Sequence, residues 1–257
     1  MKGVPRKPTL SPSKLTTYLA CPAKYYWTYL RSEGKFYLRA KSYYSFGTTL
    51  HGVLQRFHDA GDVGVTTTAE AVAAYEESWI DAGYRSAEEM AEAFGEGREI
   101  VERYVEEIVR REPEAKTIMV ERQLRKDYGD FFLLGRLDRV DEYPDGTVEV
   151  VDYKSGRSTV TTEEVESDIA MSCYQLLLRH RFPDRPVRAR IVALRTGDSA
   201  CASFTDEEAA EFEFSLTDLC RQVLNRDFFE IVPAYKSICS RCDFLPLCRK
   251  HEEFSEG

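Results

Sequence analysis

Two acidic residues and a lysine near the middle of the sequence have the types and spacing needed for metal-assisted chemistry. Asp152 and Lys154 are two residues apart at the end of an expected strand over 147–153, so their side chains share one face of it. Asp138 lies on the preceding expected strand, 130–141. The turn Y-P-D-G between these strands predicts a hairpin, which would bring the two carboxylates together.

Two carboxylates this close repel each other unless a cation lies between them, and a hard divalent ion is the natural occupant. Lys154 would add a fixed positive charge that can orient a water molecule and stabilise charge developing on a phosphate. The alternative is that these are solvated charges at strand ends. The apolar residues Val148, Val150 and Val151 precede them, so the strand is expected to be buried. This favours the first interpretation, because buried charges need partners.

Four cysteines form a second candidate metal site. Cys239, Cys242 and Cys248 are spaced C-x2-C-x5-C, and Cys21 lies more than two hundred residues earlier. Clustered cysteines in a chain without a secretory signal are better interpreted as metal ligands than as disulfides. Three thiolates need a fourth ligand to close a metal site, and the spacing alone leaves zinc and an iron–sulfur cluster open.

The distribution of charge points to phosphate as a partner. The 257 residues carry a net charge of −9, but residues 1–41 alone carry +8, which leaves −17 for the rest, and a second arginine-rich run covers 179–195. Ten aromatic residues fall within 18–46, where their rings either pack the fold or stack on unpaired bases. We expect four basic residues to contact DNA: Lys35, Arg39, Lys41 and Arg179.

Hydrophobic periodicity predicts helices first and then strands with a helix crossing between them. The expected helices are 11–30 (as two short helices), 46–60, 68–82, 86–112 with a break near Gly95 and Gly97, 162–181 and 205–226. The expected strands are 117–125, 130–141, 147–153, 187–195 and 200–204. We therefore predict one α/β domain over 1–257, with a helical lobe (11–113), a catalytic core (114–226) and a cysteine-containing segment (227–257).

No stretch approaches the roughly 20 apolar residues that span a bilayer, and the basic N-terminus lacks the apolar run of a secretory signal. The expectation is a cytoplasmic protein with no membrane partner.

The motifs G-x-x-D-x-x-D (135–141) and V-D-Y-K-S-G (151–156) together resemble the PD-(D/E)xK nuclease superfamily in its RecB-like branch. That branch includes the nuclease domains of RecB and AddB and the CRISPR-associated RecB-like exonucleases. The resemblance implies a restriction-endonuclease-like core, a mixed sheet flanked by helices. It also implies a site for Mg²⁺ or Mn²⁺ held by His51, Asp138, Asp152 and the Tyr153 carbonyl.

In the same resemblance Lys154 orients the attacking water, and Gln175 supports the scissile phosphate. The family's Q-x-x-x-Y pattern is incomplete here, because Arg179 stands where the tyrosine is expected and Tyr174 precedes the glutamine. His51 taken alone would be an ordinary helix histidine, and only its place in the family pattern makes it a candidate ligand.

The segment S-x-S-x-L-x-x-Y-x-x-C-P around Cys21, with the C-terminal trio, resembles RecB-like nucleases that hold a [4Fe–4S] cluster. In these proteins the cluster clasps the two ends of the chain, and we expect it to be structural.

The expected activity is metal-dependent hydrolysis of DNA, by an exonuclease that acts on single-stranded ends in repair or recombination, with a helicase or another repair protein as partner. Two alternatives are a CRISPR-associated nuclease that trims spacers and a DNA-binding module without catalysis.

Overall fold

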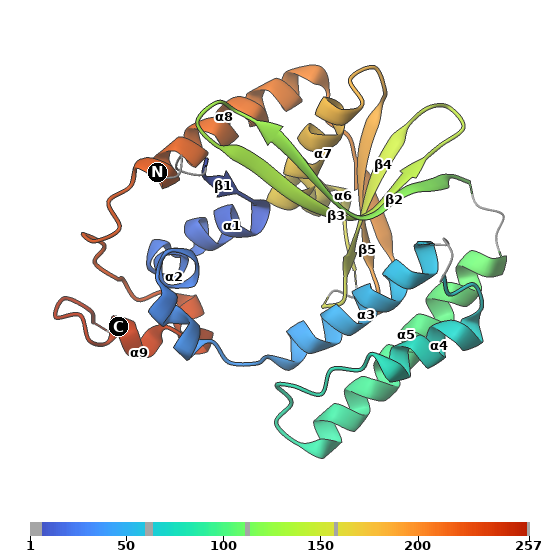
Figure 1. The fold of residues 1–257 in the computed structure, drawn as a ribbon, viewed down its shortest axis with the longest axis horizontal. Coiled ribbons are helices and arrows are strands. Elements are labelled where there is room, and N and C mark those ends of the chain that lie inside the picture. Colours follow the sequence, from blue (N-terminus) through green and yellow to red (C-terminus); the bar gives the residue numbers. More distant parts are fainter. Residues whose placement is uncertain (1–6, 60–63, 111–113, 157–158, 256–257) are drawn as a thin grey trace, which may run out of the picture. The chain divides into compact units, whose positions relative to one another are not determined.

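The computed structural model describes residues 7–59, 64–110, 114–156 and 159–255, and it divides into two compact units (Figure 1). The core unit comprises Ala40–Lys126 and Leu134–Glu211. The terminal unit comprises Met1–Arg39, Asp127–Leu133 and Phe212–Gly257, so it combines the two ends of the chain. The predicted segments 11–113 and 114–226 have different boundaries, because each unit contains parts of both segments.

A mixed sheet forms the centre of the core unit. Its strands are β2 (Lys116–Asp127), β3 (Phe132–Glu142), β4 (Val148–Lys154), β5 (Val187–Ala193) and β6 (Ser199–Ala202). The order is β3-β4-β5-β6, and β2 also pairs with β3. β4 runs antiparallel to β3 and parallel to β5, with Asp152 opposite Ile191. The expected hairpin between β3 and β4 is confirmed.

Helices cover both faces of this sheet, as the alternation of buried residues along β4 requires (Figure 1). Val151 and Tyr153 pack with α3 (Ser42–His58), α4 (Thr68–Glu77) and α5 (Ala87–Arg110). Val148 and Val150 pack on the other face with α6 (Thr162–Ser167) and α7 (Ile169–Arg181). This is the α/β arrangement expected of a restriction-endonuclease-like core.

The terminal unit joins the first and last segments of the chain. Its elements are β1 (Thr9–Leu10), α1 (Pro12–Ala20), α2 (Pro22–Tyr25), the π-helix η1 (Tyr26–Leu30), the 3₁₀ helices η2 (Ser32–Tyr37) and η3 (Ser237–Arg241), α9 (Leu245–Cys248) and most of α8 (Asp206–Asn225). β1 pairs in parallel with the start of β3, Leu10 opposite Leu133. Lys236 Nζ donates to the Ala20 carbonyl at 2.8 Å, which ties the C-terminal segment to α1.

Three elements differ from those expected. α5 continues through Gly95 and Gly97, and the glycine at 97 is needed for packing, because a Cβ there would lie 2.2 Å from the Tyr75 hydroxyl. The expected helix over 162–181 is two helices, because the Asp168 side chain accepts the N–H groups of Ala170 and Met171 and so caps a new one. α3 begins at Ser42, four residues before the expected start.

Among the described residues, no helix combines the length and the apolar character needed to cross a membrane.

Candidate active site

Strands β3 and β4 separate at the point where the predicted carboxylates lie. Their pairing runs from Glu142 opposite Val148 to Arg139 opposite Val151. One residue further, the Tyr153 N–H donates to Asp138 Oδ2 at 2.9 Å. A side-chain oxygen therefore satisfies a strand N–H, which fixes the Asp138 carboxylate beside β4.

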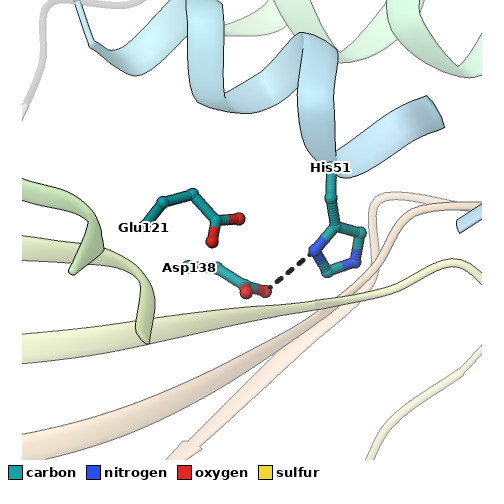
Figure 2. A group of neighbouring side chains, drawn as sticks. All are labelled: His51, Glu121 and Asp138. Atoms are coloured by element: carbon teal, nitrogen blue, oxygen red, sulfur yellow. Dashed lines mark ion pairs between the residues drawn. The ribbon is translucent and has the colours of Figure 1, made fainter. Parts of the chain in front are cut away.

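Helix α3 brings His51 to this carboxylate. The helix buries Phe46, Leu50 and Leu54 against the core, which places His51 at the edge of that face. Its Nδ1 lies 3.3 Å from Asp138 Oδ2 (Figure 2). Its Nε2 lies 2.9 Å from the Tyr153 carbonyl. Because a carbonyl only accepts, Nε2 carries the proton of that hydrogen bond, and Nδ1 is directed at the carboxylate.

A glycine stands where α3 approaches the residue after β4. A Cβ on Gly47 would lie 3.0 Å from Ser155 Oγ, so a larger residue there would require the Ser155 side chain to shift.

Glu121 completes a group that the sequence does not predict. Ligand atoms of His51, Glu121 and Asp138 all lie within 4.8 Å of one another, and all three side chains point into the same space (Figure 2). Glu121 has φ of 48° within β2, a left-handed conformation that costs a non-glycine residue about 1–3 kcal/mol. Its carboxylate is 12 % exposed and lies 2.5 Å from Arg136 Nε. The strained backbone directs a partly buried acid toward the other two residues.

Asp152 and Lys154 form an ion pair beside this group. Lys154 Nζ lies 2.6 Å from Asp152 Oδ2, and the two side chains are 30 % and 10 % exposed. Burial, together with the charge of Asp138, raises the pKa of Asp152 to about 6, against the opposing effect of Lys154. Burial lowers the pKa of Lys154, but the carboxylate of Asp152 outweighs it, so the net shift is upward and the amine stays charged.

The same carboxylates act on His51. Burial acts to lower its pKa, but the hydrogen bond and charge of Asp138, with contributions from Asp152 and Glu121, raise it overall.

An open cleft of about 730 Å³ is lined by these residues, except the buried Asp152. His51, Glu121 and Asp138 lie in it with Lys154 and Arg136, and two tyrosines from the first turn of α3 line it as well: Tyr43 and Tyr44.

The α7 residues occupy different positions from those expected. Gln175 is 1 % exposed, and its Oε1 accepts the Phe204 N–H at 2.9 Å, so it links α7 to the segment after β6 and does not line the cleft. Its neighbour Tyr174 is affected by the carboxylates, because burial and then the charges of Asp152 and Asp138 raise the pKa of its phenol.

A buried hydrogen-bond network holds the side chain of Tyr153. Arg139 Nη1 lies 2.7 Å from His58 Nε2 and from the hydroxyls of Tyr104 and Tyr153. Burial, and then the charge of Arg139, lowers the pKa of His58 to about 2, so this histidine is neutral. His51 and His58 are both on α3, and both are linked to Tyr153 or its network, so the helix is attached to β4 at two points.

The basic residues expected to contact DNA fall into three groups. Lys35 and Arg39 are exposed in the terminal unit, and Lys41 is the N-cap residue of α3 in the core unit. The Arg179 guanidinium is used in intramolecular contacts, because it binds Asp206 and the Phe204 carbonyl. Most of the arginine run at 179–195 is similarly paired: Arg185 with Glu142, Arg188 and Arg190 with Glu149, and Arg195 with Glu96. The positive charge of this run is therefore largely balanced.

The four predicted cysteines all belong to the terminal unit, but their sulfurs do not form a compact group. Over the described part of the chain, the compact ligand group is the one in the cleft. The thiols nevertheless interact. Burial, and then the charges of Cys21, Cys242 and Cys239, raise the pKa of Cys248 to about 11. Backbone N–H groups of Lys24 and Lys236 donate to Cys21 and Cys239.

Comparison with known proteins agrees with the geometry of the cleft. Residues 9–249 match the family model described as the PD-(D/E)XK nuclease superfamily, and the chain belongs to that superfamily. No curated protein matches. A candidate exonuclease from Eubacterium rectale is 13 % identical with a TM-score of 0.42, covering 84 % of this chain and 94 % of its own. SSO0001 is 11 % identical with a TM-score of 0.39, covering 96 % and 89 %.

The donor set in the cleft fits a divalent cation. Two carboxylates and an imidazole nitrogen are ligands that Mg²⁺ and Mn²⁺ accept. The Tyr153 carbonyl holds the far nitrogen of His51, as a hydrogen-bond partner commonly does for a metal-binding histidine.

Proposed function

We propose that this protein is a metal-dependent DNA nuclease, an exonuclease that degrades single-stranded ends in repair or recombination within the cytoplasm. The observation that carries the proposal is the group of His51, Glu121 and Asp138 beside the Asp152–Lys154 ion pair in an open cleft. A neutral binding module would have no use for a strained glutamate and a second buried acid at one point.

His51, Glu121 and Asp138 would hold Mg²⁺ or Mn²⁺, with Asp152 adjoining as a further ligand that the sequence predicts. The Tyr153 carbonyl, which the sequence also predicts as a ligand, would instead orient His51 by accepting the hydrogen bond of its Nε2. A divalent ion there supplies Lewis-acid stabilisation of the phosphate and a more acidic bound water. Lys154 keeps its charge, so its ammonium can orient the attacking water and stabilise negative charge on the phosphodiester. Arg136, 66 % exposed, can bind a neighbouring phosphate once Glu121 turns to the metal.

A [4Fe–4S] cluster on Cys21, Cys239, Cys242 and Cys248 is part of the proposal. Its support is that the four thiols interact electrostatically in a unit built from the two chain ends. Bound iron would remove the repulsion between thiolates and hold the ends together, since closing so long a loop is entropically unfavourable.

The experiment is a digest of end-labelled single-stranded DNA, the same strand as a closed circle, and a duplex, each with Mg²⁺, Mn²⁺ or EDTA. The proposal predicts that the linear strand is degraded with either metal and not with EDTA, and that the circle resists. No cleavage under any condition overturns the nuclease assignment. Equal cleavage of the circle overturns only the exonuclease part.

A further inference from the structure

The cleft has an aromatic side that the chemistry above does not use. Tyr43 and Tyr44, in the first turn of α3, are 61 % and 65 % exposed and line the cleft. Phe46, two residues further, is 5 % exposed and belongs to the core. Two large exposed rings beside a buried one of the same helix indicate that the tyrosines are not needed for packing.

Tyr44 is aligned with the metal-ligand group along the helix. Residues 44, 48, 51 and 55 follow one face of α3, and all four line the cleft. The seven-residue interval from Tyr44 to His51 corresponds to about 10 Å along the helix axis. That is the distance over which a strand with its phosphate at His51 would place its next few nucleotides.

The two rings contact each other without stacking in parallel. Their centroids are 4.4 Å apart, and the planes are tilted by 46°. Two cations, Arg136 and Lys154, line the same cleft, each paired with an acid that the proposed function assigns to the metal, and Lys41 precedes α3 at the positive end of its dipole.

We infer that Tyr43 and Tyr44 are a stacking platform for unpaired nucleobases next to the phosphodiester in the cleft, and that this platform makes the enzyme select single strands. A stacking ring needs the face of a base, and in a duplex both faces are covered by neighbouring base pairs. An unpaired base offers its face whatever its sequence, so the platform discriminates strandedness and not sequence. The inference rests on the proposed function for the identity of the strand.

The test uses single-stranded DNA with 2-aminopurine at successive positions from the labelled end, bound in EDTA so that no metal is present. The variants are Tyr43→Ala/Tyr44→Ala, the ring-retaining Tyr43→Phe/Tyr44→Phe, and Phe214→Ala. The last removes an exposed ring, 76 % accessible, that does not line the cleft.

Wild-type protein should quench 2-aminopurine at one or two positions, because stacking quenches its fluorescence. The alanine pair should lose the quenching and bind the single strand about tenfold or more weakly, and the phenylalanine pair and Phe214→Ala should stay within about twofold. In Mn²⁺ the alanine pair should show a raised KM, with Mn²⁺ affinity and melting temperature unchanged.

Single-strand binding by the alanine pair within about twofold of wild type, or an equal loss of duplex binding, would overturn the inference. The two proposals fail separately. If wild type quenches the probe but never cleaves DNA, the nuclease proposal fails and the platform stands. If wild type cleaves DNA and the alanine pair is indistinguishable from it, the platform fails alone.

Discussion

The cleft of the core unit and the four cysteines of the terminal unit are the two sets of side chains that the sequence predicts as metal ligands, and they are arranged differently. In the cleft, hydrogen bonds from Tyr153 to Asp138 and from His51 to Tyr153 hold the donors in place. The cysteine sulfurs lie near enough to affect the pKa of Cys248 but do not form a compact ligand group.

The difference follows from the hydrogen bonds that each kind of group can form. Carboxylates and imidazole exchange strong hydrogen bonds with the backbone, so the fold fixes their positions. Thiols form only weak hydrogen bonds, so the fold fixes the positions of the sulfurs less tightly.

The largest expected effect separates chemistry from folding. Lys154→Ala should lower DNA cleavage by about 10³-fold or more, because the cleft loses its fixed charge at the phosphate. Its melting temperature should stay within a few degrees of wild type, since Lys154 is partly exposed at the end of β4. The exposed Lys116 at the start of β2 gives a matched control, and Lys116→Ala should cleave normally. Retained cleavage by Lys154→Ala, in preparations free of contaminating nuclease, is incompatible with this mechanism.

The second effect concerns the terminal unit. Cys21→Ala should lose the iron that anaerobically purified protein contains, roughly four atoms per chain, and the terminal unit should become sensitive to protease. Cys220→Ala is the control, because Cys220 is buried in the same unit but is not one of the four. Iron and zinc are measured by elemental analysis. One zinc and no iron in wild type would show that the cluster assignment is wrong.

The third effect is a dependence of the free energy of unfolding on pH, which arises from His58. His58 has a pKa of about 2 in the folded protein, against 6.5 when unfolded, so the unfolded chain binds a proton that the folded chain does not. Stability from this group is complete above pH 6.5 and is lost as the pH falls, by about 2 kcal/mol at pH 5. Asp152 and His51, whose pKa values are raised, act in the opposite direction in both proteins. Urea unfolding at pH 7.5 and 5 should therefore show a change in stability that is less favourable for wild type than for His58→Gln, by about 2 kcal/mol. Equal changes in both proteins would mean that His58 is not held neutral.

The smallest effect isolates the strain at Glu121. Because φ at this position is 48°, Glu121→Gly should be more stable than Glu121→Ala by about 1 kcal/mol, although both lose the carboxylate. Both should bind Mn²⁺ more weakly than wild type. If the alanine variant is as stable as the glycine variant, the backbone at 121 is not strained and its link to metal binding has to be abandoned.

Much of the cleft could be predicted because its signals are local. Asp152 and Lys154 follow from strand alternation, and Asp138 follows from the turn that joins the two strands. His51 needed the family pattern, because a histidine beside an apolar helix stripe has many ordinary explanations. The order of helical and alternating segments predicted an α/β core, and the mixed sheet flanked by helices was implied by the family resemblance.

The features that were missed depend on contacts between distant segments. Glu121 becomes a candidate ligand only through the pairing of β2 with β3 and a backbone angle that no local pattern indicates. Gln175 turns to Phe204 because of how α7 packs, which a helical glutamine does not reveal. The division into two units was also not predictable from composition, since the terminal unit is assembled from both ends of the chain.

The most direct test of the central claim is a Mn²⁺ titration in which bound metal and cleavage of linear single-stranded DNA are measured in the same samples, for wild type and Asp138→Asn. The account predicts that cleavage follows occupancy of a site that wild type fills and that Asp138→Asn fills far more weakly. Cleavage that persists in EDTA, or Asp138→Asn protein that binds Mn²⁺ and cleaves as wild type does, would contradict it.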